Sequence, residues 1–108
     1  MNQQSFFKSL FEPKAIAFIG ASTSPGKWGF NILHNIIRGG YSGAIYPINP
    51  QGGTWFGRPM YKSLAEVHQP IDMAFIVVPK EKVPDTMREC GAAGIHSVVI
   101  ITAGFSET

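Results

Sequence analysis

The stretch Ala15 to Gly29, AIAFIGASTSPGKWG, decides how the rest of the chain is organised. Its first five residues are all apolar and show no alternation, which is typical of a strand buried on both faces of a parallel sheet. Small residues from Gly20 to Gly26 follow, and a helical pattern then begins. Such a loop favours anions, because the unpaired amides and the dipole of the first helical turn attract negative charge. The stretch therefore predicts a site for a phosphate-bearing ligand.

Two common nucleotide motifs fit this loop poorly. A Walker A loop has four residues between its glycines and a Ser or Thr after the lysine, but here five residues separate Gly20 from Gly26 and Trp28 takes the hydroxyl position. The G-x-G-x-x-G fingerprint is absent, and the second strand ends in Asn49 instead of an acidic residue. ATP and NAD are therefore disfavoured at this loop. A nucleotide-type ligand remains, with its phosphates near four residues: Ser22, Thr23, Ser24 and Lys27. The alternative is a tight turn that binds nothing.

Composition sets limits on the class of protein. With 108 residues the chain is long enough for one small domain, residues 1–108. A net charge of +2 without a basic stripe gives no indication of nucleic-acid binding. No apolar run reaches the ~18 residues of a membrane span, so no membrane association is expected. The single cysteine, Cys90, excludes an internal disulfide and suggests a reducing cytoplasmic compartment.

The remaining apolar runs predict an α/β fold with a Rossmann-like parallel sheet. Further strands are expected at residues 44–48, 73–78 and 98–101, with a short edge strand at Met60-Tyr61. Helices after Gly26 and from Pro84 would cover both faces of the sheet. With the edge strand counted as third, the expected strand order is 3-2-1-4-5.

The last residues resemble another loop between a strand and a helix. Gly104 and Ser106 suit that loop, and Glu107 would begin the helix. We therefore expect a fold truncated before its final helix, as in a fragment of a larger multidomain protein. At ~25 cal/mol per Å², an uncovered sheet face costs several kcal/mol, so the fragment is expected to be marginally stable or to self-associate.

The loop after the second strand, Asn49-Pro50-Gln51-Gly52-Gly53, suggests a second part of the site. In open α/β sheets, ligands bind outside the carboxyl ends of the strands. Asn49 and Gln51 are therefore expected to face the same crevice as residues 20–26. A simple turn without a ligand is an equally good interpretation of this loop alone.

Local patterns predict three further features. Ser63-x-x-Glu66 has the spacing of a capping box before a brief helix. Trp55 and Phe56 are expected to fill the core instead of stacking on a base. The helix after Pro84 is expected to bury a stripe of three residues: Val83, Met87 and Cys90.

Taken together, four stretches resemble a known family: LFEPKAIAFIGAS, GGYSGAIYPINPQGG, IDMAFIVVPKEKVP and ECGAAGIHSVVIITAGFSE. The chain is similar to the N-terminal CoA-binding domain of NDP-forming acyl-CoA synthetases of the ADP-forming acetyl-CoA synthetase type. These proteins are relatives of the alpha subunit of succinyl-CoA synthetase. The stretches cover nearly the whole chain in the same order and spacing, which is more specific than any one of them.

The resemblance implies a Rossmann-like domain that binds CoA. It places the phosphate loop at Ser22, Thr23, Ser24 and Pro25, ahead of Gly26. It places further contacts at Gln51, along Val77-Val78-Pro79 and along Ala103-Gly104-Phe105. The family often has Lys at the position of Gln51, where a cation would suit a CoA phosphate. Gln51 carries no charge, and Lys27 is a candidate to compensate.

The family reaction joins an acid to CoA at the expense of ATP, through a phosphohistidine in a later domain. ATP, ADP and Mg²⁺ belong to an ATP-grasp domain, which this sequence does not contain. None of His34, His68 and His96 matches the phosphorylated position. The resemblance therefore implies that this chain has no catalytic residue or metal site of its own and binds CoA for the remaining domains or subunit of a synthetase.

Two other functions stay open from the sequence. Related domains precede the acetyltransferase domain of some bacterial lysine acetyltransferases, where they would sense CoA or acyl-CoA. An NAD-binding Rossmann module is a further alternative, although it lacks the expected acidic residue near Asn49.

Overall fold

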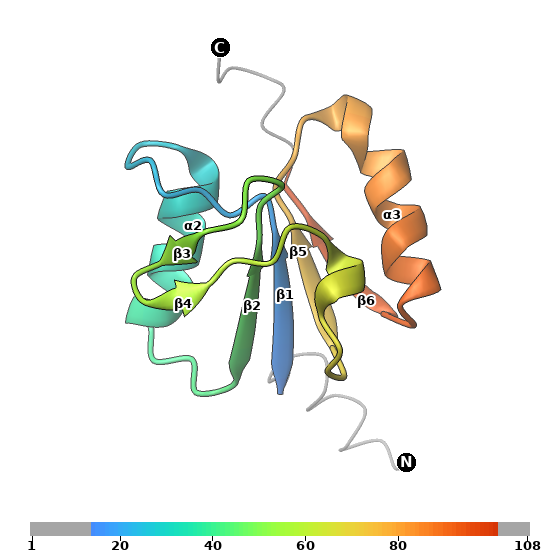
Figure 1. Ribbon diagram of the computed structural model, residues 1–108, viewed down its shortest axis with the longest axis horizontal. Coiled ribbons are helices and arrows are strands. Elements are labelled where there is room, and N and C mark those ends of the chain that lie inside the picture. Colours follow the sequence, from blue (N-terminus) through green and yellow to red (C-terminus); the bar gives the residue numbers. More distant parts are fainter. Residues whose placement is uncertain (1–13, 102–108) are drawn as a thin grey trace.

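Four parallel strands form the central sheet of the computed structural model, which describes residues 14–101 (Figure 1). They are β1 (Ala15–Ile19), β2 (Ala44–Ile48), β5 (Met73–Ile76) and β6 (Ser97–Ile100), in the order β2-β1-β5-β6. β1 lies between β2 and β5, and all five of its residues are buried. The prediction of a Rossmann-like α/β fold with a parallel sheet is confirmed.

One helix covers each face of the sheet (Figure 1). α2 (Trp28–Arg38) packs through Leu33 into the core cluster that contains Phe18. α3 (Val83–Ala92) packs through Cys90 into the cluster that contains Ala17. Neighbouring residues of β1 belong to different clusters because successive side chains of a strand point to opposite faces. The predicted placement of helices on both faces is confirmed.

The buried stripe of α3 differs from the predicted one. Cys90 is buried as expected, but Met87 is 38% exposed and Thr86 is buried in its place. The Thr86 hydroxyl donates a hydrogen bond to the carbonyl of Lys82 (2.8 Å), so its polar group is satisfied inside the protein. A threonine bonded to the preceding turn in this way is compatible with a buried position.

The predicted third strand is reduced to a single bridge between Tyr61 and Ile48 at the free edge of β2. Tyr61 donates to the carbonyl of Pro47 (2.9 Å), and its own carbonyl accepts from Asn49 (2.8 Å). The next bond toward the start of β2 would need an N–H on Pro47, which has none. The pairing therefore does not continue toward the start of β2. The predicted order 3-2-1-4-5 is observed without its strand 3, as β2-β1-β5-β6.

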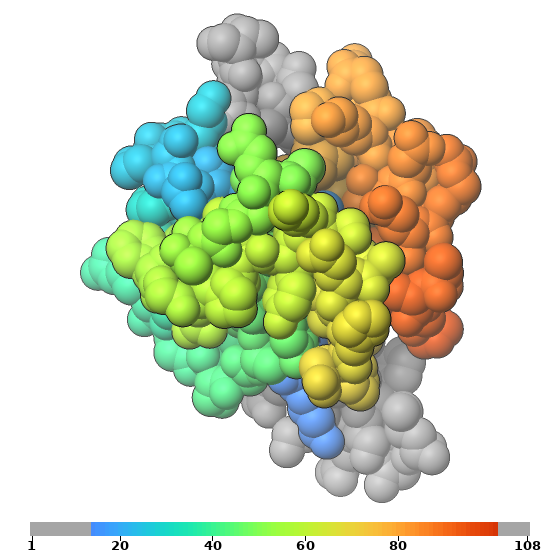
Figure 2. Space-filling model, in the orientation of Figure 1, coloured from blue at the N-terminus to red at the C-terminus, as the bar shows by residue number. Residues whose placement is uncertain are grey.

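A small hairpin precedes this bridge. Its strands are β3 (Thr54–Trp55) and β4 (Arg58–Pro59), and its atoms lie in the green segment across the front of the molecule (Figure 2). Trp55 is buried, as predicted, whereas Phe56 is 71% exposed, which the sequence did not predict. Phe56 and Gly57 both have positive φ, as in a type I′ turn, so Phe56 occupies the tip of the hairpin and not the core.

The turn after the bridge is shorter than predicted. It is a single 3₁₀ turn, η1 (Leu64–Glu66), and the side chain of Ser63 does not cap it. The Glu66 carboxylate instead accepts a hydrogen bond from the backbone N–H of Lys62 (2.9 Å). The predicted capping box is therefore wrong, although the acidic residue does bond to the backbone before the turn.

Several predicted features lie outside the described residues. They are the loop Ala103-Gly104-Phe105 and the point at which we expect the fold to be truncated. Their predicted positions stay predictions.

Two glycines allow the strand, the loop and the helix to meet closely. A Cβ atom on Gly29, in the first turn of α2, would lie 1.9 Å from the carbonyl oxygen of Gly20. A Cβ on Gly20 would lie 1.9 Å from the carbonyl oxygen of Val77, and its φ of +101° also favours glycine. The start of α2 and the end of β5 thus both contact the backbone at the end of β1.

This close approach predicts opposite effects for two helical glycines. Gly29→Ala should lower the free energy of unfolding by about 2 kcal/mol or more, because the added methyl group meets backbone that cannot move cheaply. Gly91→Ala in α3 meets nothing within 4 Å and should raise stability by about 0.5–1 kcal/mol, since alanine favours a helix. Urea unfolding of both variants measures the difference, and equal midpoints would contradict the proposed contact.

Candidate functional site

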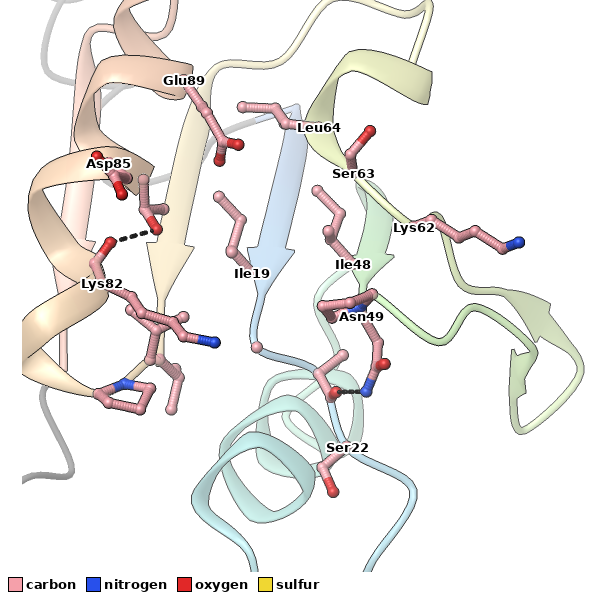
Figure 3. A pocket seen from close by; sticks show the side chains of 17 residues that line it. Ile19, Ser22, Ile48, Asn49, Lys62, Ser63, Leu64, Lys82, Asp85 and Glu89 are labelled. Carbon is pink, nitrogen blue, oxygen red and sulfur yellow. Dashed lines mark hydrogen bonds between the residues drawn. The ribbon is translucent and has the colours of Figure 1, made fainter.

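A cavity of about 530 Å³ opens at the carboxyl ends of β1, β2 and β5 (Figure 3). The loops that follow these three strands form one side of it, and η1 and the first turns of α3 form the other. Its floor is apolar, because Ile19, Ile48 and Val77 are buried residues at the strand ends. This is the edge of the sheet where ligands bind in open α/β folds.

Polar side chains surround this apolar floor. Ser22 and Asn49 come from the loops after β1 and β2, and Lys82, Asp85 and Glu89 come from the segment that begins α3 (Figure 3). Carboxylates and an ammonium group therefore line the same cavity. The arrangement suits a ligand that combines an apolar or aromatic part with charged groups.

The loop after β1 is held in place from two directions. The side-chain amide of Asn49 donates to the carbonyl of Ala21 (2.8 Å), and the buried indole N–H of Trp55 donates to the carbonyl of Ser22 (2.7 Å). The Ser22 hydroxyl also accepts from the backbone N–H of Ser24 (3.1 Å). The hairpin and the end of β2 thus fix the backbone of this loop.

Asn49 is both a turn residue and part of the cavity wall. Its side-chain oxygen accepts from the backbone N–H of Gln51 (2.8 Å), while its amide group holds Ala21. Gln51 itself is exposed and does not line the cavity. The turn interpretation and the ligand interpretation of this loop are therefore compatible.

The structure brings together only part of the predicted site. Six of the predicted residues line the cavity: Gly20, Ser22, Asn49, Val77, Val78 and Pro79. Six others lie in the exposed loop region or beyond the rim and do not line it: Thr23, Ser24, Pro25, Gly26, Lys27 and Gln51. The contacts of all of them with a ligand stay predictions.

The comparison with protein families agrees with this location. A family model described as a CoA binding domain matches residues 14–108.

The chain belongs to the CoA-binding domain family.

Relatives of this CoA-binding domain are found in ADP-forming synthetases. The alpha subunit of ADP-forming acetate–CoA ligase I from Pyrococcus furiosus is 48% identical over an alignment of 104 residues, and the match covers 93% of this chain and 22% of that protein. The ADP-forming acetate–CoA ligase of Methanocaldococcus jannaschii is 48% identical over 100 residues, 93% of this chain and 14% of that protein. The resemblance stated from the sequence is confirmed.

A solved structure shows the same fold. The apo form of a dinucleotide-forming acetyl-coenzyme A synthetase 1 from Candidatus Korarchaeum cryptofilum matches with a TM-score of 0.85 and 41% identity, over 92% of this chain and 22% of that one. The CoA-binding domain thus spans between 14% and 22% of the length of these relatives. Their names favour the synthetase interpretation over a lysine acetyltransferase module or an NAD-binding module.

Sequence reasoning missed the side of the cavity formed by η1 and α3. The residues concerned are Lys62, Ser63, Leu64, Lys82, Asp85, Thr86 and Glu89. The only signals in the sequence were the Ser63-x-x-Glu66 pattern and Pro84, which locate two turns. Neither pattern shows that η1 and α3 lie together on the same face of the sheet.

The part of the chain that the structure describes has neither a membrane-spanning helix nor a cluster of metal ligands. No helix between residues 14 and 101 is long and apolar enough to cross a membrane. In the same range, no group of three or more His, Cys, Asp or Glu residues could hold a metal ion.

Cys90 lies in the core beneath the cavity wall and not in the site. Burial raises the pKa of its thiol, and the neighbouring Glu89 carboxylate raises that pKa further. A higher pKa means a smaller thiolate fraction at a given pH, and the thiolate is the reactive form. The thiol is therefore protected in two ways: its burial blocks access by reagents, and its raised pKa keeps it protonated.

This protection predicts slow alkylation. At pH 8, iodoacetamide should modify the folded protein at least about tenfold more slowly than the protein unfolded in urea, because reaction requires local opening. A double variant, Cys90→Ala with Ser42→Cys, carries one exposed thiol and should react at the same rate in both states. Equal rates for native Cys90 in folded and unfolded protein would contradict its burial.

Proposed function

We propose that this domain binds CoA in the cavity at the ends of β1, β2 and β5. The observation that carries the proposal is the coincidence of the family match with a cavity beside the loop that precedes α2. The diphosphate of CoA would lie at the loop from Ser22 to Lys27, where the first turn of α2 has no acidic residue and no side-chain cap. An anion at this helix start would complement the dipole.

The proposed contacts divide into two groups. Loop residues take the phosphates: Ser22, Thr23, Ser24, Pro25, Gly26 and Lys27. Residues around Val77-Val78-Pro79 and Asn49 line the adenine or pantetheine side, and Ala103-Gly104-Phe105 would lie near the pantetheine arm. Gln51 would contact the ligand only from outside the cavity rim.

For the whole protein we propose an ADP-forming acyl-CoA synthetase, an acid–thiol ligase. Residues 1–108 would form its CoA-binding domain and would be inactive alone, because the phosphohistidine and the ATP-grasp domain with ATP, ADP and Mg²⁺ belong to other parts. Val99 and Ile100 on the edge strand β6 are exposed apolar residues, which supports contact with those parts or self-association. A cytoplasmic location agrees with the single free thiol.

Calorimetric titration tests the proposal. CoA should give saturable heat with the 108-residue chain, whereas NAD should give none. Thr23→Asp should weaken CoA binding by about tenfold or more, because it places a negative charge in the exposed loop beside the phosphates. Thermal unfolding of the variant should be unchanged, since Thr23 is exposed.

Ser42→Asp is the matched control. It adds the same charge at an exposed position just before β2, at the opposite end of the parallel sheet. CoA affinity should therefore remain within about twofold of the unmodified protein, since surface charges this far apart are screened. Absence of binding by a folded sample, or equal losses in both variants, would overturn the proposed site.

A further inference from the structure

One cation extends into the cavity from the side that sequence reasoning missed. Lys82 is the last residue of the 3₁₀ turn η2 (Lys80–Lys82), which leads directly into α3. Figure 3 shows its ammonium group directed into the cavity, toward the end where Ser22 and Asn49 lie. Lys62 also lines the cavity, but its ammonium group points away.

Lys82 is not neutralised by a neighbouring carboxylate. Within residues 14–101, the ion pair found joins Arg88 with Asp85, and none involves Lys82. Arg88 is thus paired with Asp85, the acidic residue of α3 that is nearest to Lys82 in the sequence. The positive charge of Lys82 is left for a ligand, since an ammonium group without a partner gains most from an anion in a partly enclosed space.

The backbone of Lys82 is fixed although its side chain is exposed. Its N–H donates to the carbonyl of Pro79 (2.9 Å), and its carbonyl accepts from the buried Thr86 hydroxyl (2.8 Å). Both bonds fix the point from which the side chain leaves the turn beside the cavity.

The cavity has a charge difference between its two ends. Glu89 directs its carboxylate into the end near Leu64, whereas Lys82 reaches toward the end near Ser22 (Figure 3). A phosphate would be repelled at the Glu89 end and attracted at the Lys82 end. Gln51 and Lys27, the sequence-based candidates for a phosphate contact, do not line the cavity.

We propose that Lys82 binds the 3′-phosphate of CoA and thereby selects CoA over dephospho-CoA. This inference rests on the proposed function, which places the CoA diphosphate at the loop before α2. The 3′-phosphate is then the remaining phosphate of the ligand, and Lys82 is the cavity-facing cation on the α3 side. Lys82 is accordingly a specificity-determining residue of the proposed site.

Titrations with two ligands and two variants test this role. Lys82→Met keeps an unbranched side chain that is one atom shorter and removes its charge, so CoA affinity should fall by about tenfold, as expected for one lost charge-assisted contact. Affinity for dephospho-CoA should change by less than about twofold. Lys80→Met removes the same charge from an exposed position in the same turn that does not line the cavity, and both affinities should be preserved.

Each result separates the inference from the proposed function. A loss of affinity confined to Lys82→Met and to CoA would support the contact with the 3′-phosphate. Equal losses for both ligands, or equal effects of the two variants, would overturn it while leaving CoA binding intact. If the unmodified protein binds neither ligand, the proposed function itself fails. Circular dichroism of both variants confirms that each is folded before it is titrated.

Discussion

The close contact between the backbones of Gly20 and Gly29 is the constraint on which the site depends. It brings the first turn of α2 against the end of β1, and the contact of Gly20 with Val77 brings β5 to the same point. A side chain at either glycine would separate these elements. Because the cavity floor consists of the residues just before these contacts, the shape of the site follows from backbone packing more than from any polar side chain.

The sequence predicted the elements whose signal is continuous and local. The unbroken apolar run Ala15–Ile19 predicted a strand buried on both faces, and the pattern after Gly26 predicted the helix α2. The prediction of an edge strand failed because the pairing lacks one backbone N–H donor. Pro47 is compatible with β2 itself, but its missing N–H removes the bond that would extend the pairing with Tyr61.

The candidate site was only half predictable for a related reason. Glycines and small residues between a strand and a helix are the typical signal of an anion-binding loop, so the loop after β1 was evident as a candidate. Lys82 and Glu89 carry no comparable signal, since they are charged residues in a polar helical segment, as on any exposed surface. Their role depends on where α3 lies beside the cavity, which is set by its packing against the sheet through Cys90 and not by any local pattern.

Rigid backbone and exposed charge therefore contribute differently to recognition. Hydrogen bonds from Asn49 and Trp55 hold the loop within the folded domain, so the proposed binding of phosphates there would require little further ordering. Lys82 and Glu89 lie at opposite ends of the cavity and would orient a charged ligand. The apolar floor cannot orient a ligand in this way. The same backbone geometry can thus serve ligands with different phosphates, and in the proposed site Lys82 and Glu89 would distinguish between them.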